Sequence, residues 1–290
     1  MWHFIDGTVE RRSIFNIQKS QKASVVQWSK ASAANRPALV FIPGFLSETS
    51  HQNDMDEWTS NIIKMADMYD FASYGLYWPS GQLWELLMGK SLSTTLSAFS
   101  ISGALVVPFI FNPVLLAGSL GISGAMLWNV IDIWKKAVSK ADEVGRNSHQ
   151  WLRLIDRPII LIGHSLGGRI VLKATSNVRK HNILQFYSLA PAVLEHECNF
   201  NKVCSGIQEK SAVFYSKNDI ILNYFFRFVE MTMTQSLGYT GITKKKNLRR
   251  IMSVNTSEVN GEPVRHRDYR RFISDILLDR RLDTHLCDLS

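Results

Sequence analysis

The sequence predicts an α/β protein whose mostly parallel central sheet is covered by helices on both faces. Two apolar runs, residues 38–45 and 158–162, are typical of strands buried on both sides. Candidate strands alternate with helical segments, which favours parallel pairing. A Gly-x-Ser-x-Gly segment, residues 163–167, follows the second run directly and precedes a stretch with helical spacing.

Length and composition agree with one folded domain. The chain has 290 residues, of which 46% are hydrophobic and 20% charged, and these proportions are typical of globular proteins. We therefore expect a single domain over residues 1–290, with an apolar helical insertion at residues 88–135.

The remaining elements follow in a regular order. The expected strands, from the N-terminal edge onward, lie at residues 7–17, 23–28, 38–45, 71–78, 158–162, 183–189, 212–216 and 250–254. The expected helices lie at residues 56–69, 133–154, 169–178 and 268–278.

The Gly-x-Ser-x-Gly segment has the context that a nucleophile requires. At a tight turn from strand to helix, a serine is held in strained backbone geometry that exposes its hydroxyl. Only small residues fit at Gly163 and Gly167 beside such a turn. We interpret Ser165 as the nucleophile, against the alternative of an ordinary glycine turn that opens a helix.

A serine hydroxyl needs a neighbouring base, and this topology places an acid and then a histidine after the nucleophile. Asp219 follows the 212–216 strand, and His266 lies between the 250–254 strand and the last helix. The simpler alternatives are a helix N-cap for Asp219 and a surface histidine beside arginines for His266. The other candidates that remain open are His285 as base and Glu258 or Asp268 as acid.

Two backbone amides are candidates for stabilising an oxyanion. Gly44, after the first buried strand, lets the backbone approach a substrate closely, so the amide of Phe45 is one expected donor. The amide of Leu166, at a helix N-terminus, is the other. Cysteines and histidines lack metal-ligand spacing, and we expect neither a metal nor an organic cofactor.

The apolar insertion has three open interpretations. No charged residue occurs from residue 91 to residue 131, and the stretch exceeds the roughly 20 residues of a membrane span. Pro108 and Pro113 disfavour one straight helix. The segment is a buried helical pair, a lid that dips into a membrane, or a spanning segment.

Charge and cysteine content suggest the setting. The net charge of +8 favours encounters with anionic surfaces. An anionic membrane is one interpretation, and a solvated basic loop at residues 244–246 without a specific partner is another; no zinc-finger, RNA-binding or helix-turn-helix signature indicates nucleic acid. Cys198 and Cys204 could form a disulfide, but a reduced cytosol is the simpler interpretation. Without a secretory signal pattern at the N-terminus, we expect a cytoplasmic protein with peripheral or integral membrane association through residues 91–131.

Four segments resemble the lipase-type α/β-hydrolases. They are Ile42-Pro43-Gly44-Phe45, residues 163–169, residues 215–219 and His266-Arg267-Asp268-Tyr269. More narrowly, residues 36–278 are similar to a hydrolase family of unknown function found in transmembrane-and-coiled-coil-domain proteins and in bacterial relatives. The resemblance implies an α/β-hydrolase fold, a triad of Ser165, Asp219 and His266, and lipid or ester substrates.

The function that we expect is cleavage of carboxylic esters, in particular lipid or phospholipid acyl esters, through an acyl-enzyme. One alternative is a non-catalytic hydrolase-fold module that interacts at a membrane. Another is a soluble thioesterase or peptidase with the same triad, because a fold does not determine its substrate.

Overall fold

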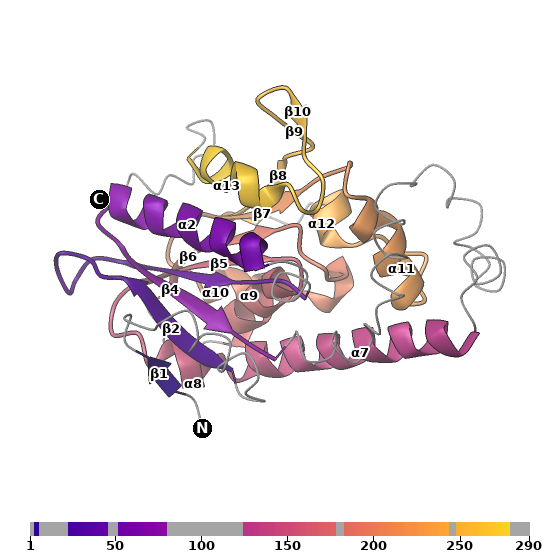
Figure 1. The fold of residues 1–290 in the computed structure, drawn as a ribbon, viewed down its shortest axis with the longest axis horizontal. Helices are drawn as coiled ribbons and strands as arrows, with labels where there is room; N and C mark the ends of the chain where they lie inside the picture. The colour runs from indigo at the N-terminus through magenta and orange to yellow at the C-terminus, as the bar shows by residue number, and fades with distance from the viewer. Residues whose placement is uncertain are drawn as a thin grey trace.

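A computed structural model describes residues 3–5, 23–45, 52–79, 124–177, 183–243 and 248–278. Their main feature is an eight-stranded sheet with the order β1-β2-β4-β3-β5-β6-β7-β8 (Figure 1). The strands are β1 (His3–Ile5), β2 (Ser24–Ser29), β3 (Ala38–Ile42), β4 (Ala72–Tyr77), β5 (Ile159–His164), β6 (Ile183–Leu189), β7 (Ser211–Tyr215) and β8 (Ile251–Asn255).

Neighbouring strands run parallel, with the single exception of the antiparallel pair β2 and β4. A separate antiparallel pair, β9 (Glu258–Val259) and β10 (Glu262–Pro263), lies after β8. This topology, with the serine turn at the end of a central strand, is the α/β-hydrolase fold that the sequence predicts.

Helices cover both faces of the sheet (Figure 1). On one face, α2 (Gln52–Met68) packs against α13 (Tyr269–Leu277), and on the other α7 (Gly124–Arg146) packs against α9 (Leu166–Asn177). The shorter elements are α8 (Ser148–Leu152), η1 (Glu195–Glu197), α10 (Phe200–Ser205), η2 (Ile221–Phe225), α11 (Phe226–Val229) and α12 (Leu237–Thr240).

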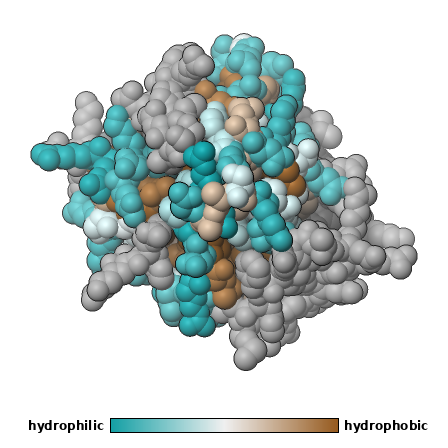
Figure 2. Space-filling model, turned by 90° about the vertical axis from the view of Figure 1, so that its left-hand side faces the viewer, coloured by the Kyte–Doolittle hydropathy of each residue, from teal (hydrophilic) through white to brown (hydrophobic). Residues whose placement is uncertain are grey.

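The core lies around the two central strands. Every residue of β3 and of β5 is buried, as their continuous apolar sequences predict for strands with helices on both sides. Phe41 of β3 stacks on Trp58 of α2 with ring centroids 4.7 Å apart, which joins the sheet to one helical layer. On the side drawn in Figure 2, hydrophilic side chains surround small hydrophobic areas.

The structure differs from the sequence-based expectations around the insertion. The helix expected at residues 133–154 begins earlier, at Gly124, and is interrupted at Asn147, so that it forms α7 and α8. Residues 124–135 of the expected insertion therefore belong to α7, while residues 88–123 lie outside the described residues, as does the expected strand at 7–17. Among the helices of the described ranges, none has both the length and the apolar character needed to cross a membrane.

A buried ion cluster joins three elements of the second helical layer. Arg169 of α9 is only 2% exposed, and its guanidinium donates to both carboxylate oxygens of Asp142 on α7, at 2.7 and 3.0 Å. It also donates to both oxygens of Glu197 on η1, each at 2.9 Å. Burial alone would lower the pKa of Arg169, but the hydrogen bonds and charges of the two carboxylates outweigh it and raise the pKa. The side chain therefore stays charged and holds α7, α9 and η1 together.

Replacing Arg169 with methionine should lower the free energy of unfolding by about 3 kcal/mol. This is the lower end of the effect of breaking a buried ion pair, because Asp142 and Glu197 keep some contact with solvent. Chemical denaturation of both proteins measures the difference. The matched control is Lys136→Met, which removes an exposed pair with Asp132 and should change stability by less than about 1 kcal/mol. Equal losses of unfolding free energy in the two variants would contradict a stabilising role for the buried ion cluster.

Candidate active site

Ser165 lies on a tight turn between β5 and α9. Its backbone φ is 55°, a conformation that is rare for residues other than glycine and that marks strain. The Ser165 amide donates to the carbonyl of Leu189 at 3.0 Å, and its carbonyl accepts from the amide of Ala192 at 3.1 Å. Neighbouring backbone from β6 and the following loop thus holds the strained turn in place, in the strand–turn–helix context of a nucleophile.

The glycines on either side of Ser165 leave no room for a side chain. A Cβ at Gly167 would collide with the carbonyl oxygen of Ile42, and a Cβ at Gly163 would collide with the backbone of Gly167. The elbow therefore requires glycine at both positions because β3, β5 and α9 approach one another so closely.

His266 and Asp219 form a hydrogen-bonded pair. His266 Nδ1 donates to Asp219 Oδ2 at 2.6 Å, and the Asp219 side chain is completely buried. Because a carboxylate only accepts, the proton lies on Nδ1 and the Nε2 lone pair stays available to take another proton. Asp219 Oδ1 also accepts from the amide of Leu222 at 2.8 Å, so Asp219 caps the following helical segment as well.

Among the described residues, no hydrogen bond joins Ser165 directly to His266. Their link is His164, the residue before Ser165, whose ring lies 4.7 Å from the ring of His266, centroid to centroid. Catalytic hydrogen bonds are often long in ligand-free proteins and tighten when substrate binds. The structure thus joins Asp219 to His266 and places His266 against the residue that precedes the serine.

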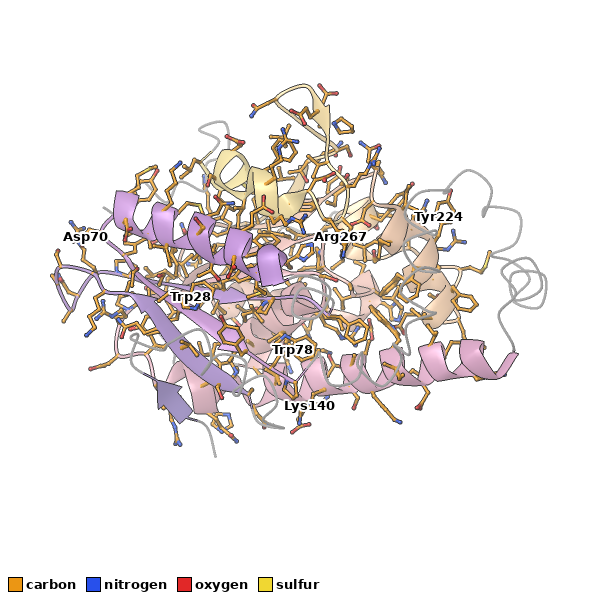
Figure 3. All side chains as sticks on the ribbon, viewed as in Figure 1. Trp28, Asp70, Trp78, Lys140, Tyr224 and Arg267 are labelled. Carbon is orange, nitrogen blue, oxygen red and sulfur yellow. The ribbon has the colours of Figure 1, made fainter. Side chains whose placement is uncertain are left out.

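The loop after β3 lies directly against the serine. A Cβ added at Gly44 would be 2.8 Å from Ser165 Cβ, so only glycine lets the loop approach this closely. The indole Nε1 of Trp78, which is labelled in Figure 3, donates to the carbonyl of Pro43 at 2.9 Å and restrains the loop. Phe45 follows in this loop, and Leu166 is the first residue of α9, where amides have no helical partner.

The other candidate acids do not take part in the contact between His266 and Asp219. Asp268 Oδ2 accepts from the amide of Arg265 at 2.8 Å, and Glu258 is exposed in the β9 strand. His285 lies outside the described residues. Cys198 and Cys204 are both free thiols. Within the described part of the chain, no group of three or more His, Cys, Asp or Glu side chains could hold a metal ion.

Sequence reasoning gave no role to His164, although it is buried at the end of β5. Its Nε2 donates to the backbone carbonyl of His266 at 2.9 Å. The signal for such a contact was a polar residue that ends an apolar strand, because a buried polar side chain requires a partner. Burial lowers the pKa of His164 well below 6.5. The neighbouring His266 ring and Arg270 act in the same direction, whereas the hydrogen bond to the His266 carbonyl opposes them.

Comparisons with known proteins give one family and several distant structures. The model of a family described as "Protein of unknown function (DUF726)" matches residues 24–283. An uncharacterized membrane protein of Caenorhabditis elegans is 27% identical over 222 residues, which cover 70% of this chain and 34% of that protein. The chain thus spans about a third of the length of this curated relative.

Among solved structures, Est1E from Butyrivibrio proteoclasticus is 10% identical with a TM-score of 0.39, covering 90% of this chain and 93% of its own. The poly(3-hydroxybutyrate) depolymerase LpqC from Bordetella parapertussis is 12% identical with a TM-score of 0.39, covering 91% and 86%. Likeness at this level says nothing about the substrate of this chain.

Stability should depend on pH through His164. Because the folded-state pKa lies below the ordinary value of 6.5, the unfolded chain binds more protons between these two values. The contribution of neutral His164 is complete above pH 6.5 and decreases as the pH falls, by up to about 1.4 kcal/mol per pH unit. Unfolding free energies of wild type and His164→Gln, measured from pH 7.5 to 5, should converge toward acid pH. Parallel curves would contradict a buried neutral imidazole.

Proposed function

The chain belongs to the DUF726 family, and we propose that it is a serine hydrolase that cleaves carboxylic esters with Ser165, His266 and Asp219. The observation that carries this proposal is the 2.6 Å hydrogen bond from His266 to the buried Asp219. The ring of His266 lies 4.7 Å, between centroids, from that of His164, and the next residue is the serine that the backbone holds at a positive φ. Such a histidine has one nitrogen committed to the carboxylate and the other available as a base.

The proposed reaction has two steps. The Ser165 hydroxyl attacks the ester carbonyl while His266 Nε2 takes its proton and returns it to the leaving alcohol, which produces an acyl-enzyme. Water then attacks the acyl group by the same route. Asp219 keeps the proton of His266 on Nδ1 and stabilises the imidazolium, since buried carboxylate and cation interact strongly away from water.

The oxyanion would be held by the amides of Phe45 and Leu166. Two features support this assignment. Gly44 packs so closely against Ser165 that an added Cβ would lie 2.8 Å from Ser165 Cβ, and Leu166 is the first residue of α9. Amides in these positions are already oriented, so the reaction does not have to reorganise them.

Removing the triad side chains should abolish or slow reaction with a fluorophosphonate probe. Ser165→Ala should eliminate labelling. His266→Ala and Asp219→Asn should slow it by roughly 10²–10⁴-fold, the usual contribution of a general base and its orienting partner. The measurement is the rate of labelling, followed by mass spectrometry of the modified peptide.

The exposed His149, on α8, supplies the matched control, since His149→Ala should label like wild type. A wild-type protein that folds but is not labelled at Ser165 would exclude the enzyme and favour the non-catalytic membrane module. If Ser165 is labelled but the protein hydrolyses only thioesters or only peptides, the alternative of a thioesterase or peptidase with the same triad would be identified.

We further infer that the acyl group is a lipid chain. Aromatic rings pack together beside the loop of Phe45: Trp134 lies 5.9 Å from Phe45, 5.9 Å from Phe225 and 6.1 Å from Phe226, measured between centroids. Rings packed edge to face offer an extended apolar wall. Because this apolar wall begins at the proposed oxyanion loop, it suits a long, apolar acyl chain better than a short or polar acyl group.

Peripheral association with an anionic membrane is part of this proposal. Large apolar side chains are exposed on or next to the helices that carry these rings. They are Trp128 on α7, and Met231 and Met233 after α11. The Tyr224 side chain lies at the same end of the molecule as α11 (Figure 3). Together with the net charge of +8, these side chains favour contact with anionic lipid.

The substitution Trp134→Ala should reduce hydrolysis of long-chain esters more than that of short-chain esters. Loss of a buried aromatic contact weakens binding of the chain by about 1–3 kcal/mol, so kcat/KM for a C16 ester should fall roughly 10- to 100-fold while a C2 ester changes little. Met68→Ala, an exposed apolar residue on α2, is the control. An equal loss on both esters would contradict an acyl-binding role.

A further inference from the structure

We propose that His164 is a positioning residue: its Nε2–H holds the backbone carbonyl of His266 and so fixes the position of the imidazole that we propose as the base. The proposal rests on the proposed function and adds a role for the histidine of the elbow. The contact is a 2.9 Å hydrogen bond between a buried ring and a backbone carbonyl in a distant loop.

The contact determines the tautomer of His164. A carbonyl oxygen only accepts, so Nε2 must carry the proton. Burial disfavours a second proton, which leaves Nδ1 as a bare acceptor. Consistent with this, Nδ1 is buried without a hydrogen-bond partner in the described structure, and it lies 3.4 Å from where a Cβ at Gly44 would be. In this orientation His164 Nε2 donates to the His266 carbonyl, while Nδ1 has no hydrogen-bond partner in the described structure.

The ring of His164 is confined on several sides. Trp58 of α2 lies 5.2 Å away, and Tyr269 of α13 lies 5.9 Å away, measured between ring centroids. The hydroxyl of Tyr269 is in turn bonded to Thr256 Oγ1 at 2.7 Å. A ring confined in this way transmits the position of β5 to the loop of His266, and β5 also carries Ser165 at its end.

Two anchors are needed because one leaves the base free to rotate. The bond from Nδ1 to Asp219 restrains the imidazole at one nitrogen only, and its Nε2 could still swing about that contact. A second restraint on the His266 backbone removes this freedom, and a displacement of about 1 Å can slow catalysis by 10²-fold.

The charges around His164 fit the same role. The groups that face it are His266, Arg270 and the uncharged Tyr269. Since buried His164 stays neutral, it adds no positive charge beside His266 at the moment when His266 becomes an imidazolium. A protonated neighbour in this place would oppose that step.

The test compares two substitutions at position 164 in the full chain. His164→Leu removes the donor at similar volume, and His164→Gln keeps an N–H near the place of Nε2. We expect labelling of Ser165 by a fluorophosphonate to slow roughly 10- to 100-fold in the leucine variant and to recover most of this loss in the glutamine variant. The exposed His149→Leu should match wild type.

Recovery in the glutamine variant separates positioning from a general loss of structure, because only a side chain that can donate to the His266 carbonyl should restore the labelling rate. Thermal unfolding shows which variants are folded at the assay temperature. A folded leucine variant with the labelling rate of wild type would overturn the proposal, as would a glutamine variant that is folded and as slow as leucine.

A measurement on wild type needs no variant to fold. In ¹⁵N spectra of labelled histidines, His164 should appear as the neutral Nε2–H tautomer down to a pH well below 6.5. A neutral ring with its proton on Nδ1 could not donate from Nε2 and would exclude the role. This result is independent of activity: absent labelling of wild-type Ser165 would remove the proposed function, whereas the wrong tautomer alone would remove only the role of His164.

Discussion

The close approach of three backbone segments at Ser165 is the constraint on which the rest of the site depends. The end of β3, the end of β5 and the start of α9 meet where Gly167 lies against Ile42 and Gly44 against Ser165. No side chain fits between them, so the serine is forced to a positive φ. Phe45 and Leu166, whose amides we propose as oxyanion donors, belong to the segments that make this turn.

A buried carboxylate shapes the other half of the site. Asp219 has no exposed surface, and a buried charge is tolerated only where hydrogen bonds satisfy it. The imidazole of His266 and the amide of Leu222 provide these bonds. The loop that carries His266 is further tied down where Ser216 Oγ donates to the carbonyl of Val264. The same contacts that make burial of Asp219 possible therefore orient the histidine.

Much of this arrangement could be predicted from local sequence. The buried strands β3 and β5 were predicted because strands that are covered on both faces of a parallel sheet have continuous apolar sequences, and the elbow because Gly-x-Ser-x-Gly follows one of them. The start of helix α7 was placed less well, because residues 124–131 are uncharged like the insertion before them and the first turn has no acidic residue to mark it. Asp219 shows a different limit, because its sequence fits both a helix cap and a histidine partner, and it is both.

The sequence by itself determined which segments form the central strands, where the strained turn lies and which residue types are available for proton transfer. These follow from the hydrophobic pattern and from the small size of glycine. Only the tertiary structure decided which polar atoms meet. The pairing of His164 Nε2 with a carbonyl 102 positions away, and the four-fold contact of Arg169 with Asp142 and Glu197, join segments whose proximity depends on how the helices pack. No local pattern encodes such distances, since each arises from the complementary shapes of elements that are remote in the chain.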